Sequence, residues 1–202
     1  LLTALSADER ARGVVAATRG NHGQGVAWAG SLLDTRVTIC VPIGNNVEKN
    51  TAMKAYGATL IERGRDYDEA VEVMSQMAAQ DGLTVAHSTN DRRIIAGAAT
   101  MTLEMLEQEP TLDAIVLAVG GGSQAVGALV VAKALAPHVE IYGVQAARAA
   151  ATHDSWHAGE RIIADSADTF ADGLATRQPY EMTFPALRDG LTDFVTVGES
   201  EI

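Results

Sequence analysis

Short apolar runs alternate with amphipathic segments along this chain, and the alternation limits the fold more than any other feature. The runs have the length of buried strands, and the segments between them are long enough for crossover helices. The expected strands cover residues 14–17, 37–41, 59–61, 84–86, 114–119, 140–144 and 194–197. The expected helices cover residues 26–33, 47–56, 67–78, 94–107, 123–135, 152–158 and 180–187. This order predicts an α/β fold of doubly wound parallel sheets with right-handed crossovers.

Three segments carry sharper expectations. The run 114–119 is apolar throughout, which is typical of a strand covered on both faces of a parallel sheet. Asn46 is expected to cap the helix that begins at Val47. The helix over 94–107 is expected to turn one side to the core, formed by Ile94, Ala98, Met101 and Met105.

Composition excludes several classes of protein. The chain has 202 residues, 47% of them hydrophobic, which is enough for a packed core and argues against disorder. A net charge of −11 argues against nucleic acid as a partner. No apolar stretch is long enough to span a membrane, and no signal-peptide pattern occurs. The one cysteine, Cys40, lies in an apolar run and is expected to be buried, so we expect a reducing, cytoplasmic environment.

A glycine-rich stretch, Thr18-Arg19-Gly20-Asn21-His22-Gly23-Gln24-Gly25, lies between the first expected strand and its helix. A loop that opens a helix presents unpaired N–H groups and the positive end of the helix dipole, and both attract anions. Asn21 and His22 add side chains that can hydrogen-bond or titrate. The alternative is a helix start whose glycines only provide clearance, and spacing alone favours that simpler interpretation.

A second cluster, Gly120-Gly121-Gly122-Ser123, follows the strand expected at 114–119 and strengthens the anion-binding interpretation. Consecutive glycines let several N–H groups converge on one phosphate, and Ser123 at the expected cap position adds a hydroxyl. With Ala125 the cluster also satisfies the G-x-G-x-x-A pattern of dinucleotide sites. Those sites need an acid at the end of the next strand. Here that strand leads into Gln145, which disfavours a dinucleotide.

Other candidates for chemistry are weaker. His153 and His157 share one helix face at i, i+4, beside Asp154. Two histidines at this spacing can bind a metal, but without an evident third ligand we expect a solvated helix face. Lys49 and Lys54 are five residues apart on one expected helix, so both are expected to have surface roles.

Taken in order, these motifs resemble the threonine/serine dehydratase (threonine ammonia-lyase) family. These are fold-type-II enzymes that depend on pyridoxal 5'-phosphate (PLP), and serine racemase is a close relative. The resemblance covers nearly the whole chain. Besides the two glycine loops it rests on Gly13-Val14-Val15, Val47-Glu48-Lys49, Tyr56-Gly57-Ala58, Ile95-Ala96-Gly97, Phe170-Ala171-Asp172-Gly173 and Phe194-Val195-Thr196-Val197.

The resemblance implies a domain organisation. It implies two doubly wound parallel-sheet domains of the tryptophan-synthase-β-like kind, partial at both ends. A boundary is expected near residue 90, where the chain would cross between two packed sheets without a linker. Residues 1–90 would form a smaller α/β domain with the Asn loop, and residues 91–202 part of the larger PLP-binding domain.

The resemblance also implies roles for individual residues. Asn21 is similar to the residue that hydrogen-bonds the PLP phenolate oxygen. The loop around it would hold the substrate carboxylate through its N–H groups, and it contains Thr18, Arg19, Gly20 and His22. The cofactor phosphate would be cradled by Gly120, Gly121, Gly122 and Ser123, with Gly173 and Asp172 near the ring. Because PLP acts as an electron sink, the protein need only fix the phosphate, orient the ring and clamp the carboxylate.

Four departures from the family pattern stand out. The cradle has three glycines and Ser123 instead of four glycines. Arg19 replaces a small residue, and we hypothesise that it forms a salt bridge away from the site or helps to bind a second acidic group on the substrate. Gln145 replaces a glutamate that ligates a divalent ion in serine racemase, so no metal is predicted. The Schiff-base lysine is expected before Leu1, and the residue facing the pyridine nitrogen after Ile202.

The chain is therefore expected to be a fragment of a longer enzyme, or else a non-catalytic remnant, and to be inactive alone. The implied reaction is PLP-dependent α,β-elimination (deamination) of an L-threonine- or L-serine-like amino acid to a 2-oxo acid and ammonia. The alternatives are an amino-acid racemase of the serine or aspartate type and a non-catalytic nucleotide- or anion-binding α/β module. The expected partners are an amino-acid substrate and further copies of the chain, in a dimer or tetramer.

Overall fold

The computed structural model describes all residues, 1–202, and divides into two compact units, Leu1–Ser88 and Thr89–Ile202. Both units contain parallel sheets, which confirms the predicted fold class. No helix in either unit is both long enough and apolar enough to cross a membrane.

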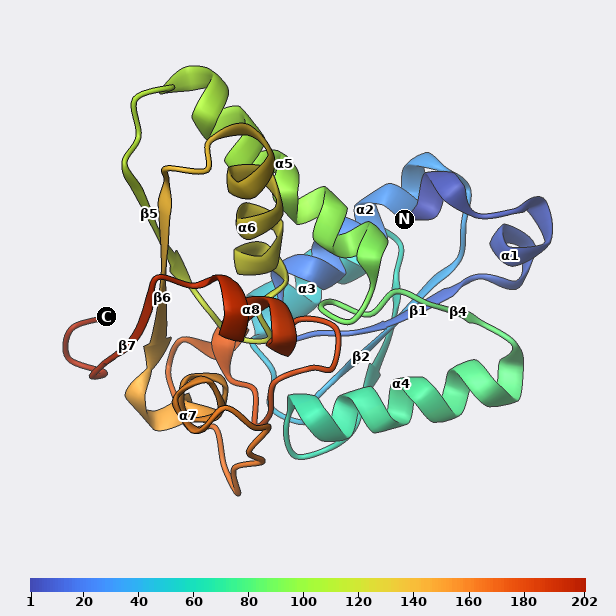
Figure 1. Ribbon diagram of the computed structural model, residues 1–202. Helices are drawn as coiled ribbons and strands as arrows, with labels where there is room; N and C mark the ends of the chain where they lie inside the picture. Colours follow the sequence, from blue (N-terminus) through green and yellow to red (C-terminus); the bar gives the residue numbers. More distant parts are fainter. The chain divides into compact units, whose positions relative to one another are not determined.

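The first unit is built on a four-stranded sheet in the order β3-β2-β1-β4 (Figure 1). Its strands are β1 (Val14–Ala17), β2 (Val37–Val41), β3 (Thr59–Glu62) and β4 (Thr84–Val85), and its main helices are α2 (Asn21–Leu32), α3 (Val47–Ala55) and α4 (Tyr67–Asp81). The chain moves outward from β1 to β3 and then returns, so that Val14 pairs with both Val37 and Thr84. Right-handed crossovers therefore place α2 and α3 on one face and α4 on the other (Figure 1).

Each face of this sheet is filled by apolar side chains. On the side of α2 and α3, Val14 and Ile39 pack in one cluster with Met53. Cys40 is fully buried, as expected, with its Sγ 3.9 Å from Met77 Sδ of α4. Burial raises the pKa of the Cys40 thiol to about 11, against a smaller lowering by Arg63, so the thiol stays protonated at neutral pH.

The chain opens with two short elements that the sequence patterns did not predict, η1 (Leu2–Ala4) and α1 (Ala7–Arg12). A capping box starts α1: Ser6 Oγ accepts from the N–H of Glu9 at 3.2 Å, and Glu9 Oε2 accepts from the N–H of Ser6 at 2.8 Å. The spacing Ser6-x-x-Glu9 was the available signal for this helix.

The second unit holds a three-stranded sheet in the order β5-β6-β7, with β5 (Ala114–Ala118), β6 (Glu140–Ala146) and β7 (Asp193–Val197). Its helices are α5 (Arg92–Gln108), α6 (Ser123–Leu135), α7 (Ala151–Ala158) and α8 (Phe184–Gly190), with short turns η2 (Ala147–Ala149) and η3 (Asp172–Leu174). Helices α5, α6 and α8 share one core with the sheet, in which Phe194 and Leu187 are almost completely buried.

The expectation that 114–119 is covered on both faces is wrong. Along β5 the burial alternates, with Ile115 and Leu117 buried and Val116 65% exposed. The alanines at the other outward positions made the run look uniformly apolar, but Ala is small enough to be accepted on either face. Composition alone could not separate these two kinds of strand.

The inward face of α5 also differs from the prediction. The helix buries Ile95, Thr102 and Leu106, whereas Met101 is 38% exposed. Helix α5 packs closely on α6. A methyl group on Gly127 of α6 would lie only 2.8 Å from the backbone nitrogen of Ala99, so no side chain separates the two helices at this point. This close approach sets how α5 is rotated about its axis, and the buried residues each follow a predicted one by one position.

Helix starts were predicted with mixed success. Asn46 caps α3 as expected, since its side chain accepts from the N–H of Lys49 at 3.0 Å. Helix α8 begins at Phe184, later than the predicted Tyr180, and has Pro185 in its first turn. Proline is favoured there because its missing N–H has no partner in a first turn anyway.

Candidate functional site

The Asn loop, residues 18–22, runs from the carboxyl end of β1 into the first turn of helix α2. The helix begins at Asn21 with Gly20 as its N-cap, so His22 to Gly25 are helical and the loop itself is shorter than predicted. Strand β1 is flanked by β2 and β4, which is where the chain reverses its direction across the sheet. Ligands of open α/β sheets bind outside the carboxyl ends of the strands at such a switch point.

Hydrogen bonds inside the loop decide which donors remain available. The N–H of Gly20 donates to Thr18 Oγ1 at 2.9 Å, and Thr18 donates from its own N–H to the Cys40 carbonyl at 3.1 Å. The N–H groups of Arg19 and Asn21 have no acceptor within the protein. The Asn21 side chain is exposed and has no hydrogen-bond partner either. Asn21 can therefore offer both backbone and side chain to a ligand.

The two charged or titratable side chains of the loop have different surroundings. His22 Nε2 lies 2.8 Å from the Ala86 carbonyl, and because a carbonyl only accepts, Nε2 carries the proton. Arg19 is half-buried, its Nε is buried without a partner, and it forms no ion pair with an acidic residue of the chain.

Lys49 is the residue of this site that sequence reasoning missed. A methyl group on Gly20 would lie 2.8 Å from Lys49 Cδ and 3.3 Å from Lys49 Nζ, so the half-buried lysine covers the loop. Its predicted surface role is wrong. The available signal was position: α3 follows β2, whose carboxyl end lies at the same sheet edge as that of β1.

The glycine cluster joins β5 to α6, and a side chain at any of its three glycines would meet close neighbours. A methyl group on Gly120 would lie 3.0 Å from Leu174 Cα, and one on Gly121 would lie 2.5 Å from Thr89 Oγ1. Gly122 has φ +92°, and it, not Ser123, is the N-cap of α6; Ser123 is the first helical residue. The expected cap position of Ser123 is therefore wrong by one residue.

The donors of this cluster fit a phosphate. The N–H groups of Gly121, Gly122 and Ser123 have no acceptor within the protein, although both glycines are buried. Buried N–H groups without partners are rare in folded proteins, and several of them at a helix start form an anion site. Gly173 is exposed in η3, and the contact between Leu174 and Gly120 brings η3 to the cluster.

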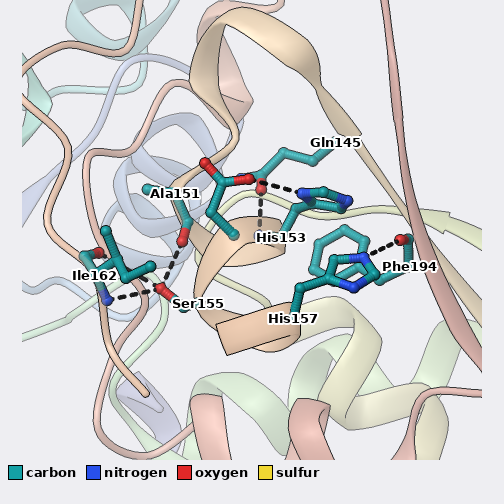
Figure 2. A network of polar contacts seen from close by, with 8 residues as sticks. Gln145, Ala151, His153, Ser155, His157, Ile162 and Phe194 are labelled. Atoms are coloured by element: carbon teal, nitrogen blue, oxygen red, sulfur yellow. Dashed lines mark hydrogen bonds and ion pairs between the residues drawn. The ribbon is translucent and has the colours of Figure 1, made fainter. Parts of the chain in front are cut away.

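The two histidines of α7 are not a fully solvated face as predicted. The His153 and His157 rings meet edge to face at 4.4 Å, and the His153 ring also packs on Phe194 at 5.5 Å. His157 Nε2 contacts the Phe194 carbonyl at 3.2 Å (Figure 2). Gln145 is fully buried and turns its Oε1 to the N–H of His153. No group of three or more His, Cys, Asp or Glu side chains is arranged to hold a metal.

A cavity of about 360 Å³ lies at the opposite edge of the first sheet, where β1, β2 and β3 begin. Its lining includes Arg12, Arg36 and Asp81. Ligands of parallel sheets bind at the carboxyl ends of the strands, so the Asn loop, and not this cavity, is the candidate ligand site of the first unit.

Parallel α/β units whose glycine loops open helices with unused N–H groups are typical of enzymes that hold a phosphorylated cofactor. The pyridoxal-phosphate dependent enzyme family (PALP) matches the chain over residues 1–202, and the chain belongs to that family. This confirms the family resemblance and PLP as the cofactor of the family. The roles of single residues and of the two domains stay predictions.

Named relatives agree with this assignment. The chain is 36% identical to an L-threonine ammonia-lyase of Thermotoga maritima over 198 residues, 98% of this chain and 49% of the relative. It is 34% identical to an L-threonine ammonia-lyase of Geobacter sulfurreducens over 201 residues, 100% of this chain and 50% of the relative. The chain thus spans about half the length of these curated relatives.

Solved structures have the same fold. The match to the processed form of threonine deaminase isoform 2 from Solanum lycopersicum has a TM-score of 0.90 at 33% identity. It covers 98% of this chain and 57% of the deaminase chain. The match to maize serine racemase has a TM-score of 0.91 at 30% identity. It covers 98% of this chain and 60% of the racemase chain.

Proposed function

We propose that the protein containing this chain catalyses PLP-dependent α,β-elimination of a threonine- or serine-like hydroxy-amino acid, giving a 2-oxo acid and ammonia. The observation that carries the proposal is the set of acceptor-free N–H groups at Gly121, Gly122 and Ser123, in a chain that belongs to a PLP-dependent family. The names of the relatives, threonine ammonia-lyase and threonine deaminase, support this reaction over others.

Each glycine-rich segment would have its own role. In the second unit Gly120 to Ser123 would hold the cofactor phosphate, with Gly173 nearby. In the first unit Asn21 would hold the ring oxygen, and the N–H groups of the Asn loop would bind the substrate carboxylate. When bound, PLP supplies the electron sink for cleavage at the α-carbon. The protein groups orient the substrate, which accounts for much of such catalysis.

Three side chains would support the substrate. The hydrogen bond from His22 to the Ala86 carbonyl fixes the first turn of α2, so that the loop donors keep their direction. Lys49 and Arg19 would add positive charge beside the loop, where a carboxylate is favoured by the helix dipole as well.

Product analysis tests the proposed reaction. The purified protein is incubated with PLP and L-threonine or L-serine, and 2-oxo acid and ammonia are quantified together. Equal amounts of both products support the lyase. Accumulation of the D-amino acid without 2-oxo acid would instead establish the racemase alternative, which the likeness to maize serine racemase motivates.

Ligand binding separates the enzyme from a non-catalytic module. Uptake of PLP, followed by absorbance, is expected, whereas NAD should not bind because Gln145 stands where a ribose-binding acid would be needed. Tight binding of NAD without uptake of PLP would contradict the proposal.

The proposal includes a cytoplasmic location and a homo-oligomeric state, dimer or tetramer. A single, fully buried cysteine suits a reducing compartment. Light scattering coupled to size-exclusion chromatography gives the mass in solution, and a monomer at micromolar concentration would contradict the homo-oligomer.

A further inference from the structure

The carbonyl groups of the glycine cluster are held by two threonine hydroxyls. Thr152, in the first turn of α7, donates from Oγ1 to the Gly120 carbonyl at 2.9 Å. Thr183, directly before α8, donates from Oγ1 to the Gly121 carbonyl at 2.7 Å, with the Tyr180 carbonyl a weaker alternative at 3.5 Å. Both threonines are 0% exposed, so water does not compete for these carbonyls.

Neither hydroxyl makes its shorter hydrogen bond to a partner that lies close in the sequence. Thr183 is the N-cap residue of α8, where threonine usually accepts from the first-turn N–H groups, but it makes no such bond. Pro185, in that first turn, has no N–H to offer. A threonine inside a helix commonly bonds back to the preceding turn, whereas Thr152 reaches a carbonyl 32 residues away in the sequence.

These two hydrogen bonds also determine the directions of the N–H groups of Gly121 and Gly122, because each peptide group is planar. In a trans peptide the C=O and the N–H point in opposite directions, and the chain contains no cis peptide bond. The Gly120 carbonyl shares its peptide group with the N–H of Gly121, and the Gly121 carbonyl shares its own with the N–H of Gly122. Holding each carbonyl therefore directs the acceptor-free N–H of the same peptide group away from the threonine that holds it.

Helix α7 is itself fixed, so Thr152 has a rigid base. Figure 2 shows Gln145 Oε1 accepting from the N–H of His153 at 2.9 Å, and Ser155 accepting from the N–H of Ile162 at 2.8 Å. Trp156 Nε1 donates to the Leu187 carbonyl of α8 at 3.0 Å, which ties α7, the helix that contains Thr152, to α8, the helix that Thr183 precedes.

We propose that Thr152 and Thr183 are positioning residues that preset the N–H groups of Gly121 and Gly122 for the cofactor phosphate. The inference rests on the phosphate-binding role proposed for the glycine cluster. Three consecutive glycines have large conformational freedom, and a cradle made of them needs to be held from outside to be preorganised. The threonines do this without placing a side chain on the loop, where none fits.

The test compares the affinities of the apoprotein for PLP and for pyridoxal, which lacks the phosphate. In Thr152→Val and Thr183→Val the shape is kept and the hydroxyl is lost. Each variant should weaken PLP binding about tenfold and pyridoxal binding little, because a freed carbonyl lets its peptide rotate. Thr152→Ser and Thr183→Ser keep a hydroxyl and should restore the preference for PLP.

Thr102→Val is the matched control. Thr102 is fully buried in α5 of the same unit, and its Oγ1 has no hydrogen-bond partner, so the same chemical change should leave the PLP-to-pyridoxal ratio unaltered. Thermal midpoints measured alongside separate loss of stability from loss of phosphate recognition.

The outcomes distinguish the two levels of the argument. A wild-type protein that binds PLP no better than pyridoxal would refute the phosphate cradle itself. A wild-type protein with a clear preference that both valine variants retain would overturn the positioning role alone. Equal weakening of both ligands, together with a lower thermal midpoint, would assign the threonines to stability and would also overturn it. If Thr152→Val does not fold, Thr183→Val carries the same test.

Discussion

Gly122 meets two demands that exclude other residue types. Its φ of +92° is unfavourable for any side chain, and a methyl group there would lie 2.6 Å from Leu187 Cδ1. Gly122→Ala is therefore expected to lower the free energy of unfolding by about 2 kcal/mol or more, and to abolish phosphate recognition. Urea unfolding measures the first effect and PLP titration the second.

Gly97 provides the control for this substitution. It lies exposed in the interior of α5, and an added methyl group would have no neighbour within 4 Å. Gly97→Ala should raise stability by about 0.5–1 kcal/mol, because alanine favours the helix and restricts the unfolded chain. If both substitutions changed stability alike, the packing argument for the glycine cluster would be wrong.

Arg19 allows a prediction about substrate preference. The sequence suggested two roles for Arg19, a salt bridge away from the site or binding of a second acidic group on the substrate. The structure contains no ion pair that would hold Arg19 away from the loop, and Arg19 Nε is buried without a partner. We therefore expect Arg19→Ala to lower kcat/KM for 3-hydroxyaspartate about tenfold or more and that for threonine much less. Equal losses on the two substrates would rule out recognition of a second carboxylate.

At the scale of single residues, the hydrogen-bond donors of the site could be predicted from the sequence, but the threonine hydroxyls that hold the glycine cluster could not. The glycine cluster and Asn21 could be proposed from residue type, since convergent N–H groups require glycines next to a helix start. The threonine hydroxyls could not, because Thr152 and Thr183 are 32 and 62 residues from their acceptors in the sequence. Such contacts depend on how α7 and α8 pack, and no local pattern encodes that.

Helix α5 begins with a charged cap whose effect depends on pH. Asp91 accepts from the N–H of Arg93 at 2.8 Å and forms an ion pair with its guanidinium at 2.7 Å. Burial alone would raise the pKa of Asp91, but the hydrogen bonds from Arg93 outweigh burial and lower it. The charged form is thus favoured in the folded state, and its stabilisation is present above the unfolded pKa, about 4, and lost at lower pH.

Asp91→Ala should lower the free energy of unfolding by about 1 kcal/mol at pH 7. The difference from wild type should shrink as the pH falls below about 4, since both proteins then lack the charged cap. Chemical unfolding at several pH values measures this. Asp91→Asn is the control, because it keeps an acceptor for the N–H of Arg93 and should lose most of the pH dependence. A difference that grew in acid would contradict the assignment.

Element boundaries and faces show where pattern reading stops. The cap at Asn46 was predictable because capping is local. The face of α5 was not, because its two adjacent apolar rows are nearly equal and the close contact at Gly127 of α6 decides between them. The prediction that β5 is covered on both faces was wrong for a similar reason, because an apolar run does not show which elements pack against the strand.

At the scale of the molecule, each unit has its own hydrophobic core, and the first unit should fold alone. A chain of residues 1–88 is expected to unfold in one cooperative transition on heating, followed by circular dichroism. A chain of residues 1–83 lacks β4, leaves one side of β1 without a partner, and should melt at a lower temperature or without cooperativity. Equal melting of the two chains would contradict this.

The class of fold was predictable because the alternation of strands and helices leaves a parallel α/β architecture as the main solution. The strand order was not. Nothing in the short, half-buried segment Thr84–Val85 shows that it returns to β1 instead of extending the sheet beyond β3. The edge at which β4 pairs depends on how the helices pack against the sheet, which is a property of the folded unit.

The return of β4 to β1 has a consequence for how the protein is made. Thr84, the second neighbour of Val14, leaves the ribosome 70 residues after Val14 (84 − 14). At a translation rate of about 5–20 residues per second, one edge of β1 stays open for several seconds, and an open edge is a template for wrong pairing. The sheet of the first unit cannot be completed before Thr84 has emerged, so the time needed to translate the segment between these strands sets the earliest moment at which the unit can fold.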